Sequence, residues 1–227
     1  MRKRLLLAAL GTLILFPLAG WGILAIFRDN SLAIMFRSPV AVWLQIPSGI
    51  ALGFALGYGA QYVVSRPFLG GVEKKYSRII AGLKLKHWHI IFISLCAGFG
   101  EELLFRGAIQ PLIGLWITAI VFVAIHGYLD PRDWKMTVYG VYMTLAIAAL
   151  GYYTDYMGII GASLAHAGID YVLFRHLIKS GKSQFNDRIE IELPQENMFE
   201  TNLDETDSQT ITTEKATNTL NKPLLLL

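Results

Sequence analysis

The chain has 227 residues, of which 54% are hydrophobic, and a mean hydropathy of +0.46. This composition excludes an ordinary soluble domain and indicates a polytopic membrane protein, because several uncharged runs are long enough to cross a bilayer. The net charge of +3 is uneven, with 16 Lys and Arg against 8 Asp and Glu in residues 1–179 and 4 against 9 in residues 180–227; we expect the basic part to contact the lipid bilayer, not nucleic acid.

The first apolar run follows a basic start and covers residues 5–27. It is longer than the apolar core of a secretory signal peptide, so we expect a retained span instead of a cleaved leader. A second span is predicted over residues 40–64, where glycines and alanines between 49 and 57 favour close helix packing. Residues 66–86 are basic and carry apolar side chains at helical spacing, which predicts an amphipathic helix on the membrane surface.

Four further spans are predicted in the rest of the membrane part. The third begins at Trp88 and ends near Gln110-Pro111, because proline breaks a helix. The others are expected at residues 113–129, 136–154 and 156–178. Lys and Arg gather beside every second connection, so the positive-inside rule places both termini in the cytoplasm. The predicted fold class is therefore an all-α, six-span transmembrane bundle with an interfacial amphipathic helix.

The sequence divides into two parts. Residues 1–179 are expected to form the membrane-embedded domain. From Ser180 onward the chain becomes polar and acidic with few aromatic residues, so it cannot bury enough apolar area to fold alone. We expect residues 180–227 to be a disordered cytoplasmic tail.

Three charges interrupt the third predicted span, within the run from Gly100 to Gly107. Each ionised side chain at the middle of a spanning helix costs about 2.5 to 3.5 kcal/mol on insertion scales, so an offsetting interaction is expected. Glu102 and Arg106 are four residues apart and can form an ion pair on one helix face. Glu101 points about 100° away from Glu102. Its uncompensated carboxyl is the first candidate for a general base.

Two more ionisable sets lie in later spans. His126 follows Phe122 by four residues and Asp170 follows His166 by four, so the members of each pair share a helix face. At a rise of 1.5 Å per residue, Glu101, His126 and His166 are expected within about 10 Å of one depth. A carboxyl and two histidines on three spans favour a single polar site over separate helix-packing roles.

Such a site favours hydrolysis by a carboxylate-activated water, with histidines that either polarise the water or hold a metal. Neither His126 nor His166 is followed by Glu, so the H-E-x-x-H pattern of zinc proteases is missing. Ser163 lies three residues before His166, but no nucleophile elbow surrounds it. Residues 98–101 only half resemble the G-x-G-D motif of intramembrane aspartyl proteases, and a second buried aspartate at a matching position is missing.

The segment from Ser94 to Phe174 resembles the CPBP group, also called Abi or CAAX-protease-like intramembrane proteases. The three motifs of that family, E-E-x-x-x-R, F-x-x-x-H and H-x-x-x-N or D, occur here in order. They stand as Glu101-Glu102 with Arg106, Phe122 with His126, and His166 with Asp170. The resemblance implies an intramembrane endopeptidase for peptide or protein substrates associated with the membrane, and residues 94–174 form its motif core.

The resemblance also implies a role for each matched residue. Glu101 would be the general base, His126 would orient the water, and His166 with Asp170 would bind the oxyanion. Glu102 and Arg106 would support them. Where many family members carry Asn, Asp170 cannot donate a hydrogen bond while ionised, so it must be protonated or act by orienting His166.

The sequence leaves two questions open. Glu101, His126 and His166 could hold a divalent metal such as zinc with an open position, and a metal-independent mechanism is equally compatible with them. A non-catalytic membrane scaffold or a bacteriocin-immunity-type protein is the alternative function. A transporter is disfavoured, because the predicted spans are few and none form a pair of broken helices.

Overall fold

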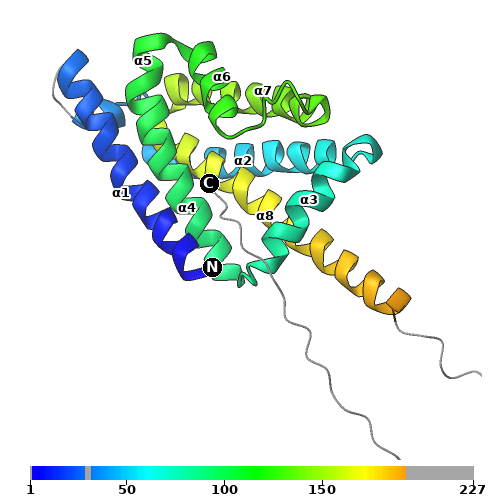
Figure 1. The fold of residues 1–227 in the computed structure, drawn as a ribbon. Helices are drawn as coiled ribbons and strands as arrows, with labels where there is room; N and C mark the ends of the chain where they lie inside the picture. Colours follow the sequence, from blue (N-terminus) through cyan, green and yellow to red (C-terminus); the bar gives the residue numbers. More distant parts are fainter. Residues whose placement is uncertain (1, 29–31, 193–227) are drawn as a thin grey trace, which may run out of the picture.

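The computed structural model describes residues 2–28 and 32–192 (Figure 1). Every regular element within these residues is a helix, which confirms the all-α class. The main helices are α1 (Arg2–Phe27), α2 (Val42–Val64), α3 (Gly70–Gly82), α4 (His87–Leu104), α6 (Leu115–Ile125), α7 (Trp134–Met157) and α8 (Ile159–Glu192). The short ones are η1 (Leu32–Phe36), η2 (Pro67–Leu69), η3 (Phe105–Ile109) and α5 (Gln110–Ile113).

Fewer helices than predicted meet the length and hydropathy of a membrane span. Among the described residues, three helical segments are long and apolar enough to cross a bilayer: Arg2–Phe27, His87–Ile113 and Trp134–Met157. The six-span count is therefore not confirmed. The expected fourth span is the 11-residue helix α6, which reaches only about 16 Å at 1.5 Å per residue and so covers about half of a hydrocarbon core.

The chain reverses after the third predicted span at Gly114, not at Pro111. Pro111 lies in the first turn of α5, where a missing N–H is tolerated. The helix ends at Ile113, and Gly114 then takes a φ of 85°, a conformation that glycine adopts without steric cost. Before that turn, η3 is a π-helical segment, the kind of irregularity often found at functional sites.

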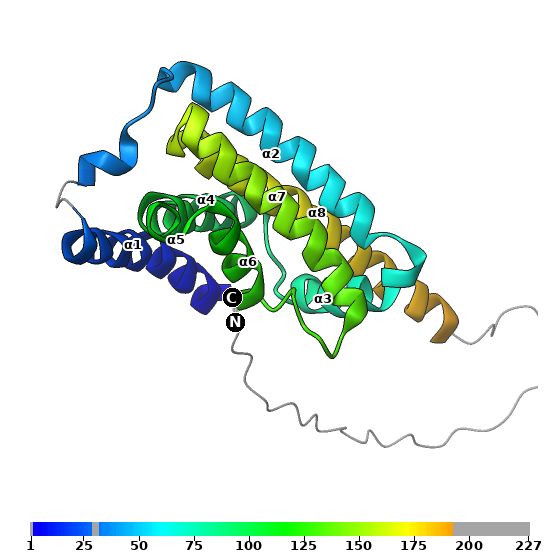
Figure 2. The same cartoon turned by 90° about the horizontal axis from the view of Figure 1, so that it is seen from above.

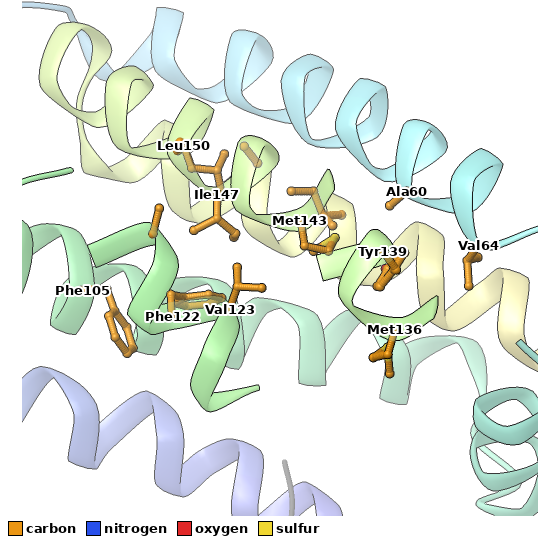
Figure 3. Packing of buried hydrophobic residues seen from close by; sticks show 14 of the residues in the cluster. Ala60, Val64, Phe105, Phe122, Val123, Met136, Tyr139, Met143, Ile147 and Leu150 are labelled. Atoms are coloured by element: carbon orange, nitrogen blue, oxygen red, sulfur yellow. The ribbon is translucent and has the colours of Figure 1, made fainter. Parts of the chain in front are cut away.

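Helix α4 packs between α1 and α8. Figure 2 shows α1 beside α4 and away from α2, residues of α1 and α4 share a small apolar cluster, and α4 contacts α8 on its other side. The larger core fills the space between α6, α7, α2 and α8, and Figure 3 shows Phe122, Val123 and Ile147 within it. The close packing of these apolar side chains fixes α6 against α7.

The structure adds detail to two expected segments, the amphipathic helix within residues 66–86 and the start of the tail at Ser180. The amphipathic segment forms α3, whose Val72 and Ser77 are buried against other helices, chiefly α8. Val72 on its apolar face therefore contacts protein, while Tyr76, Ile79 and Ile80 are half-buried. Helix α8 continues to Glu192, so the boundary expected at Ser180 falls inside a helix. The rest of the predicted tail, residues 193–227, lies outside the described residues.

Candidate active site

The site residues predicted from the sequence come from three parts of the fold. The end of α4 with η3, the end of α6, and the middle of α8 converge on one region. The residues are Glu101, Glu102 and Arg106, then Phe122 and His126, then His166 and Asp170. The structure brings all seven into one cluster.

Glu101 is the common neighbour of both histidines. Its Oε2 atom lies 3.5 Å from Nε2 of His126 and 3.9 Å from Nε2 of His166. Both distances exceed a good hydrogen bond of about 2.7 to 3.2 Å, so the three groups face one another without direct bonding. The side chains of Glu101 and His126 are 14% and 27% exposed, so a small molecule can reach them.

Glu102 holds His166 from the other side. Nδ1 of His166 lies 2.9 Å from Oε1 of Glu102, and Nε of Arg106 donates to Oε2 of the same carboxylate at 2.9 Å. The Glu102 and Arg106 side chains are both fully buried, and the guanidinium favours the ionised carboxylate. Because an ionised carboxylate only accepts hydrogen bonds, Nδ1 of His166 carries the proton. Its Nε2 is thereby turned toward Glu101.

His126 is fixed by the helix that precedes it. Its Nδ1 donates to the backbone oxygen of Phe122 at 2.7 Å, because a carbonyl oxygen can only accept. The two rings stack with centroids 4.4 Å apart, and the Phe122 ring meets His166 edge-on at 5.6 Å. One phenylalanine therefore contacts both histidines, and each histidine presents Nε2 to Glu101.

Arg106 belongs to a buried network that sequence reasoning missed. It donates to Oε1 of Gln110 at 3.3 Å and to the backbone oxygen of Ile147 at 3.1 Å. Gln110 in turn donates to Oδ1 of Asp155 at 3.0 Å. The four-residue spacing of Arg106 and Gln110 was a usable signal. The contacts of Arg106 and Gln110 with α7 could not be predicted, because no spacing within the sequence sets the register between two helices.

Asp170 does not hydrogen-bond to His166. Its Oδ1 lies 3.9 Å from Nε2 of His166, which is too long for a hydrogen bond. The contact that orients His166 is made by Glu102 instead. The buried hydroxyl of Ser163 has no hydrogen-bond partner within the described part of the chain, so it does not pair with His166.

The described residues do not make a metal-binding group. Among residues 2–28 and 32–192, no three His, Cys, Asp or Glu side chains are arranged to hold a metal ion. Glu101, His126 and His166 face one another at 3.5 and 3.9 Å, and both the zinc site and the metal-independent mechanism stay predictions.

Comparison with known proteins agrees with the motifs. Residues 83–172 match the family described as Rce1-like, type II CAAX prenyl endopeptidase Rce1-like, which confirms the resemblance to the CAAX-protease-like group. The uncharacterized protein YpbD of Bacillus subtilis (strain 168) is 44% identical over 57 residues, which are 25% of this chain and 28% of that protein. The match thus spans less than a third of YpbD. No solved structure matches this chain.

Proposed function

We propose, from the CAAX-protease-like segment 83–172 and the geometry around Glu101, that this protein is an intramembrane endopeptidase for membrane-associated peptide or protein substrates. One observation carries the proposal. Oε2 of Glu101 faces Nε2 of both His126 and His166, while Nδ1 of each ring is held by another group. Fixed histidines around a reachable carboxylate suit the activation of water.

In the proposed first step, a water molecule sits between Glu101 and the carbonyl carbon of the scissile bond. Glu101 accepts one proton of the water as its oxygen adds to that carbon. Nε2 of His126 accepts a hydrogen bond from the second proton of the water and thereby aims it. The stacked Phe122 ring holds His126 in place, so little ordering is needed when the reaction begins.

In the proposed second step, His166 stabilises the oxyanion. An imidazolium at this position donates from Nε2 to the negative oxygen, while its Nδ1 donates to the Glu102 carboxylate. The Asp170 carboxylate, 3.9 Å from Nε2 of His166, favours the positive ring by charge instead of donating to the oxyanion. Glu101 then passes its proton to the leaving nitrogen, and the C–N bond breaks to give a carboxylic acid and an amine.

The proposed placement in the membrane follows the charged ends of the helices. The start of α1, helix α3 and the far end of α8 lie at one end of the bundle (Figure 1). Basic residues gather in the first two of these segments. Under the positive-inside rule we place this end, and with it both termini, in the cytoplasm.

Cleavage of a quenched peptide library by the purified full chain in lipid nanodiscs tests the proposal. We expect Glu101→Gln to lower the cleavage rate by at least about 100-fold, the lower range for loss of a general base. Glu73→Gln is the matched control, because Glu73 also faces a histidine, His176 at 2.9 Å, but lies in α3 outside the site. Each protein is assayed with and without a strong chelator.

The outcomes separate the mechanisms. Cleavage that persists in the presence of chelator and is lost only in Glu101→Gln supports the metal-independent mechanism. Cleavage abolished by chelator in the wild type would instead show that a metal is required. Full activity of Glu101→Gln would contradict the role of Glu101. No cleavage by the wild type under any condition would favour the scaffold or immunity-type function.

A further inference from the structure

A second polar feature lies at the other end of the bundle from the start of α1. It is a cavity of about 230 Å³, formed where α1 and α7 end and α8 begins, next to η1 and η3. Its polar lining residues include Arg28, Arg37, Arg106 and Asp155. Three guanidinium groups line this cavity with a single lining carboxylate, and one of the three, Arg106, is paired with the Glu102 carboxylate outside the lining. The remaining net positive charge favours an anion.

Arg106 lines this cavity although it also supports the active site. An arginine has five N–H donors. Contacts within the described residues place one N–H on Glu102, one on Gln110 and one on the Ile147 backbone oxygen. The other two N–H groups of this buried side chain are thus available to a group inside the cavity. The lining carboxylate of Asp155 already accepts from Gln110.

The backbone at the start of α8 also favours an anion in this cavity. Helix α8 begins at Ile159, which lines the cavity. The first N–H groups of a long helix and its dipole give this end a partial positive charge, which suits bound anions. Arg28 is held beside another lining residue, Pro111, whose backbone oxygen accepts a hydrogen bond from its guanidinium at 3.1 Å.

The apolar surroundings indicate what kind of anion fits. Leu24 and Met35 line the cavity beside the arginines, and α1 exposes Trp21, Ile26 and Phe27 near the same end. Tryptophan beside exposed aliphatic residues is typical of the membrane interface. A tetrahedral group with several acceptor oxygens would bind the arginines, and hydrocarbon attached to it would contact the apolar lining residues.

We propose that this cavity binds a phosphate group through Arg28, Arg37 and Arg106, with a membrane phospholipid headgroup or free phosphate as its source. The cavity holds the headgroup, and the acyl chains of a lipid lie along the exposed face of α1. Guanidinium groups recognise phosphate oxygens by paired, charge-assisted hydrogen bonds. Phosphate binding is measured without a peptide-cleavage assay. The result therefore tests this proposal independently of the proposed peptidase activity.

The test compares two double variants of the full chain. Arg28→Gln with Arg37→Gln removes two cavity guanidiniums and leaves Arg106 intact. Arg4→Gln with Arg78→Gln removes the same charge from exposed positions in α1 and α3 at the other end of the bundle. Retention of phosphatidylglycerol by native mass spectrometry is one readout, and thermal stabilisation by inorganic phosphate in detergent is the other.

We expect the cavity variant to bind phosphatidylglycerol at least about tenfold more weakly than the wild type, as loss of charge-assisted hydrogen bonds predicts. The control variant should retain wild-type affinity. Stabilisation by inorganic phosphate that depends on Arg28 and Arg37 would identify free phosphate as a sufficient ligand. Binding of lipid alone would identify the headgroup.

Equal binding by the cavity variant and the control in both readouts would overturn the proposal. Arg37→Gln alone keeps the test valid if the double variant does not fold, because Arg37 is exposed and its replacement leaves the helix contacts unchanged.

Discussion

Glu102 and His166 are 64 positions apart in the sequence, yet Oε1 of Glu102 lies 2.9 Å from Nδ1 of His166. This contact ties α4 to α8 inside the bundle. The other oxygen of the same carboxylate accepts from Arg106 at 2.9 Å. One buried carboxylate therefore balances a guanidinium and sets the direction of a histidine, so we expect its removal to lower both stability and the proposed peptide cleavage.

The first prediction concerns the charge of Glu102. Glu102→Gln leaves the buried guanidinium of Arg106 uncompensated, and we expect a loss of about 3 to 5 kcal/mol in the free energy of unfolding. Glu101→Gln is the control, because that carboxyl is partly exposed. Denaturant or thermal unfolding in detergent measures both. Equal unfolding free energies of the two variants would show that the negative charge of Glu102 does not contribute to stability.

A second prediction concerns the ring of Phe122, which stacks on His126 with centroids 4.4 Å apart and meets Phe105 edge-on at 4.9 Å. Phe122→Leu keeps an apolar side chain but removes the stacking partner. We expect the cleavage rate to fall by up to about 100-fold through misplacement of His126. Its unfolding free energy should fall by less than about 1.5 kcal/mol if the core repacks. Leu150→Met, a fully buried position in the same core, is the control.

Wild-type cleavage by Phe122→Leu would mean that the Nδ1 contact with the backbone suffices to hold His126. In that case, the stacked ring would only fill the core.

Much of the site was predictable because its motifs are local. The four-residue spacing of Glu102 and Arg106 fixes a shared helix face, and the structure shows the ion pair. Helix rise predicts Glu101, His126 and His166 at a similar depth. In agreement, Glu101 faces both histidines in the structure. Their chemical roles stay predictions.

The contacts between helices could not be predicted from the sequence. Glu102 reaches His166, and Gln110 reaches Asp155, only because α4 and α5 pack on α8 and α7 in one register. The six-span count is not confirmed, because the helix boundaries differ from those expected. Gly114 ends the helix where proline was expected to end it, and α6 is too short to cross a bilayer. An apolar run in the sequence does not by itself fix where its helix begins and ends.

A third prediction concerns the crossing of α2 and α8. A methyl group at Gly53 would collide with the backbone oxygen of Ala165, the residue before His166. We expect Gly53→Ala to cost about 1 to 3 kcal/mol of unfolding free energy through overpacking and to lower cleavage, because the backbone beside His166 must move. Thermal unfolding and peptide cleavage measure the two effects.

Gly11→Ala is the matched control, since nothing lies within 4 Å of its added methyl group. Alanine is favoured over glycine in a helix by about 1 kcal/mol, so this variant should be at least as stable as the wild type. If Gly53→Ala behaved in the same way, the close approach of α2 and α8 would not be required for the fold.

The last prediction separates Ser163 from the catalytic chemistry. Its side chain is 1% exposed, and its hydroxyl has no hydrogen-bond partner within the described residues. An unsatisfied buried hydroxyl carries a desolvation cost of about 1 to 3 kcal/mol, so Ser163→Ala should raise the free energy of unfolding and leave cleavage unchanged. Unfolding in detergent and peptide cleavage check the two parts. Lost cleavage in Ser163→Ala would reopen a serine mechanism next to His166.

Ser77→Ala provides the matched comparison, because that hydroxyl is equally buried but fully engaged. It donates to the backbone oxygen of Lys74 at 3.2 Å and accepts from Gln184 at 3.1 Å. Removing it breaks both hydrogen bonds, so we expect a loss of about 1 kcal/mol or more in the unfolding free energy. Two Ser→Ala changes at buried sites should therefore shift stability in opposite directions, because what matters is whether the hydroxyl has a partner.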